Sequence, residues 1–334
     1  MPNSCLIVVC AVTLFWSSAW AQPDTPMPAP PQAQQRLMQS VVAVQTQTDD
    51  DASSTRSLGN QRQGSGVVIG TDLVLTVGYL LIEAQSVDLI DHRGRKIPGQ
   101  VRAVDNINGL GLIRSLVPLR LEPVPLGDSD KLQAPTRLWT LGHSESAPTA
   151  LELVSRKPFA GTWEYLLESP LMTLPAVNNW SGSGLFDEQG QLIGIGSLLV
   201  QDVFGDKLPL PGNLFVPVNV LKTPLPDLLR TGKRAGPAPS WLGIHSQARS
   251  DGGLVILRVA PNSPAEQAGI EVGDTLLALQ GQAIADLADF YRRLWRLGPA
   301  GSSVELTVLR DNQTRAVKLV TGDRALSLKR PRGV

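Results

Sequence analysis

Short runs of β-branched and apolar residues, separated by turn residues, fill the chain between residues 36 and 221. The runs are VVAVQTQ, GSGVVIG, LVLTVG, SVDLID, QVRAV, LGLIRS, TRLWTLG, QLIGIGSLLV and LFVPV. Many short strands with frequent Gly, Asp and Asn between them are typical of a barrel or a sandwich. The pattern therefore predicts an all-β domain over 36–221.

A domain of a different kind is predicted over residues 241–322. Its expected strands lie at 253–260, 275–280, 303–310 and 315–320, and its helical patterns lie near 263–270 and 286–297. Asp286 can cap the start of the second helical pattern and Gly298 can end it. The fold class expected for the whole chain is thus mainly β, with a small α+β domain at its C-terminal side.

Proline-rich segments separate these units. Residues 22–35 contain almost no large apolar residue, and residues 222–240 replace the apolar periodicity with Pro, Gly, Lys and Arg. Both segments are predicted to be linkers. The basic residues 323–334 are predicted to be a frayed tail.

The first 21 residues are typical of a secretory signal peptide. An apolar stretch runs from Leu6 to Trp16, and the small residues Ala19 and Ala21 follow it as an A-x-A cleavage site. No Lys or Arg precedes the apolar stretch, so an uncleaved membrane anchor is the alternative. Either interpretation predicts export.

Charge and composition exclude several classes of protein. The chain has 30 Lys and Arg against 30 Asp and Glu, so we do not expect nucleic acid as a partner. Cys5 and Cys10 both lie in the predicted signal peptide, which leaves the exported chain without a thiol for a disulfide or a zinc site. The three histidines, His92, His143 and His245, are too far apart in sequence for a His-x-x-x-His pair. We expect no metal and no other cofactor.

Three motifs of the α+β domain point to one family. They are WLGI at 241–244, VAPNSPAEQAGIEVGD at 259–274 and VELTVLRDNQ at 304–313. On these motifs, the segment resembles the PDZ domain of HtrA-family proteases.

Four motifs of the upstream domain agree with that resemblance. They are GSGVVIG at 64–70, LGDSDKL at 126–132, SGSGLFDEQGQLIGI at 181–195 and FVPVN at 215–219. The region resembles the trypsin-like protease domain of the same family. The resemblance covers roughly residues 36–322 and implies two six-stranded barrels followed by one PDZ domain.

The catalytic triad that the resemblance implies is degenerate. Tyr79 stands at the position of the family's histidine base, and Gly109 at that of its aspartate. Ser181 aligns with the nucleophile, in a register that the following LFDEQGQLIGI favours over Ser183. A phenol with a pKa of about 10 is a poor base at neutral pH, and loss of the histidine costs roughly 10⁶ in turnover. We expect Tyr79 to pack in the vacated histidine site.

The neighbours of Ser181 differ from the family as well. Asn179 replaces the oxyanion-hole glycine, and because asparagine tolerates positive φ the hole could survive. Trp180 is bulky enough to fill the cleft. Asp105 and His143 are candidate replacement bases, which leaves a serine endopeptidase with a non-standard base as the alternative function.

The PDZ-like domain retains the elements that peptide binding requires. The resemblance assigns a terminal carboxylate to the backbone N–H groups of the WLGI loop, an extended peptide to the following strand, and an apolar pocket to the helix after residue 286. The candidate residues are Leu242, Gly243 and Ile244 in the loop and Leu287, Tyr291 and Leu294 on the helix. His245 could touch a bound peptide.

The sequence therefore predicts an exported, periplasmic HtrA-like pseudoprotease. It would bind apolar C-terminal tails of unfolded envelope proteins without cutting them, as a holdase, an adaptor or a subunit that modulates an active relative. The family commonly assembles as trimers, so the resemblance implies that a homotrimer is an option here. An alternative for the tail is that the Val334 carboxylate docks in the PDZ groove of a neighbouring molecule.

Overall fold

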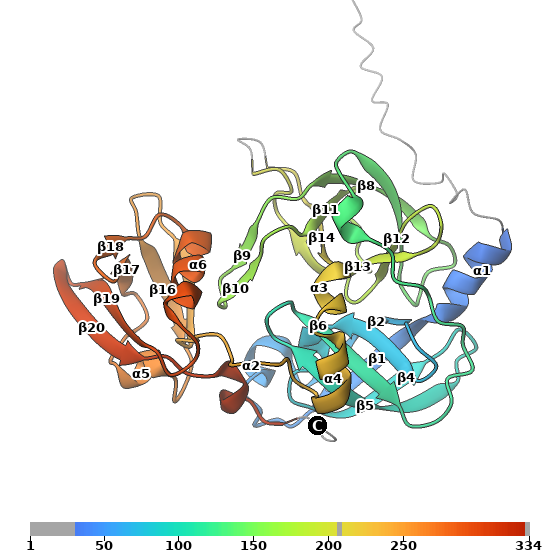
Figure 1. The fold of residues 1–334 in the computed structure, drawn as a ribbon, viewed down its shortest axis with the longest axis horizontal. Helices are drawn as coiled ribbons and strands as arrows, with labels where there is room; N and C mark the ends of the chain where they lie inside the picture. Colours follow the sequence, from blue (N-terminus) through green and yellow to red (C-terminus); the bar gives the residue numbers. More distant parts are fainter. Residues whose placement is uncertain (1–30, 206–208, 331–334) are drawn as a thin grey trace, which may run out of the picture.

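Two closed barrels followed by a smaller sheet domain form the fold (Figure 1). The computed structural model describes residues 31–205 and 209–330. The predicted fold class, mainly β with a small α+β domain at the C-terminal side, is confirmed. The predicted signal peptide lies outside the described residues.

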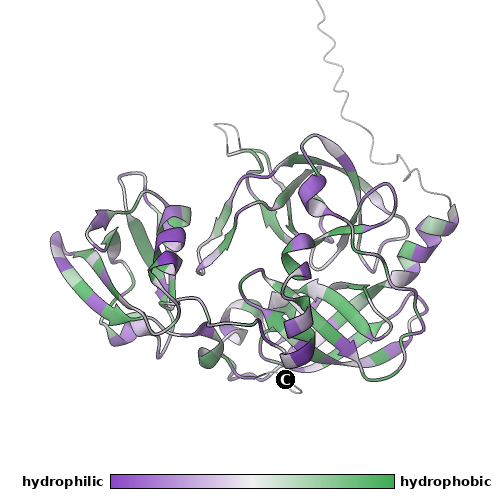
Figure 2. Cartoon of the chain, viewed as in Figure 1, coloured by the Kyte–Doolittle hydropathy of each residue, from purple (hydrophilic) through white to green (hydrophobic). Residues whose placement is uncertain are grey.

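The first barrel is built from β1 to β6, in the order β1-β2-β3-β6-β5-β4. Its strands are β1 (Val41–Thr48), β2 (Gln61–Val68), β3 (Leu73–Val77), β4 (Ala84–Ile90), β5 (Lys96–Asp105) and β6 (Leu110–Ser115). Two short helices interrupt it, α2 (Thr55–Leu58) and the 3₁₀ helix η1 (Gly78–Leu80). Figure 2 shows mostly hydrophobic residues along these strands, as burial inside a barrel requires.

The second barrel has the strand order β11-β14-β13-β12-β7-β8. Its strands are β7 (Thr136–Leu141), β8 (Thr149–Ser155), β11 (Leu171–Leu174), β12 (Gly184–Phe186), β13 (Leu192–Val200) and β14 (Gly212–Pro217), with the 3₁₀ helix η2 (Ser129–Lys131) before them. A separate hairpin of β9 (Phe159–Gly161) and β10 (Tyr165–Leu167) leaves this barrel and extends toward the third domain (Figure 1).

The third domain is a sheet of order β15-β16-β17-β19-β20, with β18 paired to β17. Its elements are β15 (Ile244–Ala248), β16 (Leu254–Val259), α5 (Pro264–Gln267), β17 (Thr275–Leu279), β18 (Gln282–Ala283), α6 (Leu287–Leu297), β19 (Ser303–Arg310) and β20 (Gln313–Val320). Asp286 caps α6 as expected, because its side chain accepts a hydrogen bond from the backbone N–H of Asp289 at 2.8 Å. None of the helices within residues 31–205 and 209–330 is long and apolar enough to cross a membrane.

Both predicted linkers are wrong over part of their length, because helices form there. Helix α1 (Pro31–Ser40) begins inside the 22–35 segment, and its Leu37 is buried against the first barrel. Helices α3 (Asn219–Lys222) and α4 (Leu225–Thr231) enter the second segment, where Leu228 is buried. In each case one apolar residue packs into a barrel core, which the local composition does not indicate.

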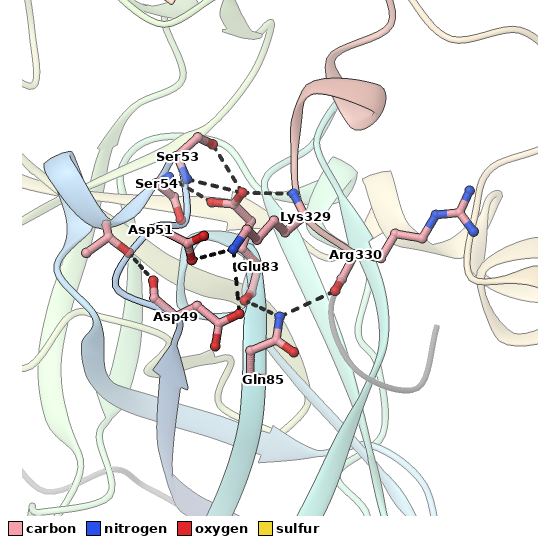
Figure 3. Close-up of polar contacts among 9 residues, drawn as sticks. Asp49, Asp51, Ser53, Ser54, Glu83, Gln85, Lys329 and Arg330 are labelled. Atoms are coloured by element: carbon pink, nitrogen blue, oxygen red, sulfur yellow. Dashed lines mark hydrogen bonds and ion pairs between the residues drawn. The ribbon is translucent and has the colours of Figure 1, made fainter. Parts of the chain in front are cut away.

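The C-terminal segment, residues 323–330, is also not frayed as predicted. After the 3₁₀ helix η3 (Arg324–Ser327), it returns from the third domain to the first barrel (Figure 1). The ammonium group of Lys329 pairs with Asp51 and lies 3.7 Å from a carboxylate oxygen of Asp49 (Figure 3). Val334 lies outside the described residues.

The buried carboxylate of Glu83 receives this segment. Its Oε1 accepts the backbone N–H of Lys329 at 2.8 Å, and its Oε2 accepts that of Ser54 at 2.7 Å (Figure 3). Burial opposes ionisation, but the hydrogen bonds from Ser54, Lys329 and Ser53 outweigh it and lower the pKa of Glu83. An ionised carboxylate thus ties the chain that follows the third domain to the first barrel.

Candidate functional site

Tyr79 and Ser181 meet between the two barrels. Tyr79 lies on η1, directly after β3, and the buried guanidinium of Arg62 fixes this turn by donating to the carbonyl oxygens of Tyr79 (2.9 Å) and Ile82 (2.6 Å). The hydroxyl of Tyr79 donates a hydrogen bond to Ser181 Oγ at 2.7 Å. The residue at the histidine position therefore does contact the residue at the nucleophile position.

The direction of this hydrogen bond is opposite to the one that catalysis needs. A general base must accept the proton of the serine hydroxyl. Burial raises the pKa of Tyr79 to about 12, although the hydrogen bond to Ser181 acts the other way. At neutral pH the phenol is protonated and acts as the donor to Ser181.

Gly109 leaves no space for an orienting aspartate. Its φ is +71°, a conformation that glycine adopts readily. A Cβ atom at this position would lie 2.9 Å from the hydroxyl oxygen of Tyr165, which donates to the carbonyl oxygen of Asn108 at 2.8 Å. The ring of Tyr165, supplied by β10, thus occupies the space next to the vacated aspartate position.

The residues around Ser181 make contacts of their own. The φ of Asn179 is not positive, and its side-chain amide donates to Glu145 at 3.5 Å; an oxyanion hole at its backbone N–H stays a prediction. Trp180 packs edge-on against Tyr79, with ring centroids 6.5 Å apart. Ser183 is fully buried and donates to the carbonyl oxygen of Trp180 at 3.0 Å, so it is not accessible as an alternative nucleophile.

The two candidate replacement bases have other partners. Asp105 forms a bidentate ion pair with Arg234, at 2.7 and 2.9 Å. The Nδ1 atom of His143 lies 3.1 Å from Ser65 Oγ, and burial lowers the pKa of this imidazole. In the described part of the chain, neither residue forms a hydrogen bond with Ser181.

The carboxylate-binding loop of the third domain is already filled, by a side chain of the second barrel. The backbone N–H groups of Leu242, Gly243 and Ile244 donate to the carboxylate of Glu164 at 2.8, 2.7 and 2.9 Å. Glu164 is buried at the end of the hairpin β9–β10, with a φ of +57°. The three predicted donors do bind a carboxylate, and it comes from the same chain.

Burial dominates the electrostatics of Glu164. It raises the pKa of this carboxyl to about 7, against the opposing effect of the three N–H donors and of the positive charge of Arg324. The phenol of Tyr291 faces the same group, and burial raises its pKa as well. The loop is thus shielded from solvent, and its N–H groups donate to the carboxyl group of Glu164 instead of to water.

The rest of the hairpin also lies in the groove. The backbone N–H of Ser246, on β15, donates to the carbonyl oxygen of Thr162 at 2.9 Å, and the hydroxyl of Tyr291 donates to that of Gly161 at 2.9 Å. Leu166, on β10, is buried in the core cluster of the third domain. The hairpin therefore brings a carboxylate, a main-chain contact and an apolar side chain to this domain.

The other predicted groove residues have different surroundings. Leu294 is fully buried and belongs to the core, whereas Leu287 is half-buried at the start of α6. His245 is half-buried, and burial, followed by the charges of Arg258 and Arg324, lowers its pKa. Of the three helix candidates, Tyr291 is the one that contacts the hairpin directly through a hydrogen bond.

A cavity of about 580 Å³ lies between the barrels and the third domain. Tyr79 and Trp180 line it from the barrels, Trp163 from the hairpin, and Trp241 and His245 from the third domain. The predicted triad positions and the loop that binds Glu164 therefore lie at one junction between domains.

Comparisons with known proteins agree with this architecture. Residues 64–195 match the trypsin-like peptidase domain family, and residues 240–321 match the PDZ domain family. The chain is 26% identical to periplasmic serine endoprotease DegP of Escherichia coli over 283 residues, which cover 78% of this chain and 58% of that protein. It is also 26% identical, over 273 residues, to the Haemophilus influenzae protein named "Probable periplasmic serine protease do/HhoA-like", covering 77% of this chain and 57% of that protein. The chain spans just over half the length of these relatives.

Solved structures show the same fold. The HtrA-type protease AlgW with a decapeptide superposes with a TM-score of 0.53 at 20% identity, covering 87% of this chain and 98% of that one. The same protease with a tripeptide gives a TM-score of 0.51 at 19% identity, covering 88% and 97%. The chain is a trypsin-like double barrel joined to a PDZ domain. It belongs to the HtrA-like family, and the names of its curated relatives support the predicted periplasmic location.

Sequence reasoning missed the residues that fill the two sites. Glu164 and Tyr165 lie in the stretch GTWEYLL, which carries no motif, and the strands β9 and β10 on either side of its turn have only 3 residues each. A lone glutamate in an aromatic turn is the only local signal. Its partners are about 80 residues away in sequence, so only the fold identifies its role.

Proposed function

We propose that this chain is a periplasmic HtrA-like protein that recognises apolar C-terminal tails of unfolded envelope proteins through its PDZ domain and does not cleave them. The observation that carries the non-cleaving part is the hydrogen bond from Tyr79 to Ser181. A neutral phenol that donates to the serine cannot remove its proton. Gly109 and Tyr165 together remove the orienting carboxylate.

The PDZ loop supports the recognition part of the proposal. Its three N–H groups bind a carboxylate at 2.7–2.9 Å, which is the contact that a terminal carboxylate would make. The adjacent β15 is the edge strand of its sheet, where an extended peptide would pair in place of the contact between Ser246 and Thr162. The protein would thus bind the tails of envelope proteins without cutting them, as a holdase or an adaptor does.

Two assays on the purified protein test the two parts. A fluorophosphonate probe should leave Ser181 unlabelled, with an active serine protease as the positive control; stoichiometric labelling of Ser181 would refute the non-cleaving part. A fluorescent peptide with an apolar last residue should bind, and the same peptide with an amidated C-terminus should not. Equal binding of the free and amidated peptides would refute recognition through the carboxylate loop.

A further inference from the structure

We infer that the end of the hairpin β9–β10 is the internal ligand of the PDZ groove, so that an external C-terminal tail binds only after it displaces the Glu164 carboxylate. This inference rests on the proposed tail recognition and adds its regulation. The groove is closed by the chain itself, and tail binding is coupled to movement of a segment of the protease-like domain.

The carboxylate contacts exclude simultaneous binding. Both carboxylate oxygens of Glu164 are engaged, Oε1 by Gly243 and Ile244 and Oε2 by Leu242. A terminal carboxylate also has two oxygens and needs the same donors. Because one loop cannot hold two buried anions at once, a tail has to replace Glu164.

The hairpin imitates the other parts of a tail as well. The carbonyl oxygen of Thr162 takes the N–H of Ser246, a donor that a paired peptide strand would use. Leu166 contributes an apolar side chain to the PDZ core, and Ala160 packs against the same core. Displacement therefore exposes apolar surface of the hairpin in addition to freeing the loop.

Adjacent residues connect the groove to the degenerate triad. Glu164 points into the PDZ loop, whereas the next residue, Tyr165, lies against Gly109 and donates to Asn108. Trp163 stacks on Tyr165, with ring centroids 5.7 Å apart. A tail that removes Glu164 from the loop pulls on the segment that fills the vacated aspartate position.

Competition from within the chain lowers the apparent affinity for tails. A tethered ligand acts at an effective concentration of millimolar order, and apparent affinity falls in proportion to the fraction of open groove. Replacing Glu164 with glutamine keeps the size of the side chain but presents an amide NH₂ to N–H donors. We expect Glu164→Gln to bind a tail peptide about tenfold or more tightly than the wild type, in proportion to the increase in open groove.

Glu168→Gln is the matched control. Glu168 follows the same hairpin and forms an exposed ion pair with Arg292 on α6, at 2.6 Å. The substitution removes one carboxylate that also bridges the two domains but does not enter the loop. We expect its tail affinity to stay close to that of the wild type.

Hydrogen exchange on the full chain tests the inference independently of affinity. Without peptide, the amides of Leu242, Gly243 and Ile244 should be protected in the wild type and in Glu168→Gln, and lose protection in Glu164→Gln. In the wild type, saturating peptide should increase exchange in residues 161–166, a result that requires no variant. Unchanged protection in Glu164→Gln, with equal peptide affinity for all three proteins, would overturn the inference and leave tail recognition intact. If the loop amides lose protection in Glu164→Gln but none of the three proteins binds the peptide, Glu164 is the internal ligand and tail recognition is refuted.

Discussion

The hydroxyl of Tyr79 donates to Ser181 Oγ at 2.7 Å, between residues 102 positions apart in sequence. The two residues are as close as a general base and its nucleophile, but here the residue at the position of the base donates the proton instead of accepting it. The ring of Tyr79 packs edge-on against Trp180. The positions of the predicted triad residues Tyr79 and Ser181 thus form a packed, hydrogen-bonded junction.

Tyr79→Phe tests this interpretation. It removes the donor while the ring can still pack against Trp180, so we expect the free energy of unfolding to fall by about 1 kcal/mol. Urea denaturation measures this change. A peptidase activity that is present in the wild type and lost in Tyr79→Phe would show instead that the phenol acts as a base.

Gly109→Asp should not rebuild the triad and should destabilise the barrel. The new side chain would have a φ of +71° and would collide with Tyr165. Gly94→Asp is the matched control, because Gly94 has a φ of +77° but nothing within 4 Å of an added Cβ. We expect the free energy of unfolding to fall by about 1 kcal/mol in Gly94→Asp, and by about 1–3 kcal/mol more than that in Gly109→Asp. Equal losses in chemical denaturation would rule out the collision.

Tail binding should depend on pH through Glu164. Its pKa is about 7 when docked and returns toward 4.5 when displaced, so the docked state binds more protons between these values. Docking of Glu164 in the loop is therefore most favourable below about pH 4.5. The equilibrium constant for docking falls by up to tenfold per pH unit until about pH 7. The ratio of Glu164→Gln affinity to wild-type affinity should shrink from about pH 5.5 to about pH 8, as titration calorimetry can measure.

The other groups around the loop do not reverse this trend. An arginine such as Arg324 stays charged over this range, and the raised pKa of Tyr291 keeps its phenol neutral. The lowered pKa of His245 moves the titration of this imidazole toward the acid end of the range. A ratio that is constant with pH would mean that Glu164 does not change its protonation on displacement.

The contact between Glu83 and the C-terminal segment should control proteolysis of that segment. Glu83→Gln places an NH₂ group opposite N–H donors, so trypsin should cleave after Arg324 and Lys329 about tenfold faster, which corresponds to roughly 1.4 kcal/mol of lost local stability. Asp51→Asn removes only an exposed partner of Lys329, so trypsin should cleave this variant at nearly the rate at which it cleaves the wild type. Equal rates for the two variants would show that Glu83 does not hold the segment.

The sequence predicts the β framework of this protein well, because alternation and turn residues are local signals. β1 to β7, β13, β14 and the strands of the PDZ domain other than β18 coincide with predicted runs or motifs. Helices α1 and α4 were missed because Leu37 and Leu228 are stabilised by packing in the barrel core, which the local composition does not indicate. A proline-rich composition lowers helix propensity but does not prevent a short helix that packs.

The candidate site was predictable as a set of positions but not as a set of contacts. Tyr79, Gly109 and Ser181 could be located from motifs, whereas the ring of Tyr165 beside Gly109 could not. The carboxylate loop could be located in the same way, but Glu164 in it could not. Each of these partners comes from a hairpin whose position depends on the whole fold.

Cleavage of an unfolded substrate distinguishes a protein that only binds its partners from one that cuts them. Purified protein and its Ser181→Ala variant would be incubated with unfolded, protease-sensitive protein, with and without an apolar-tailed peptide, and the products followed by mass spectrometry. The account predicts no cleavage by either protein under either condition. Peptide-stimulated cleavage that disappears in Ser181→Ala would contradict it and would mean that displacing Glu164 assembles an active serine protease.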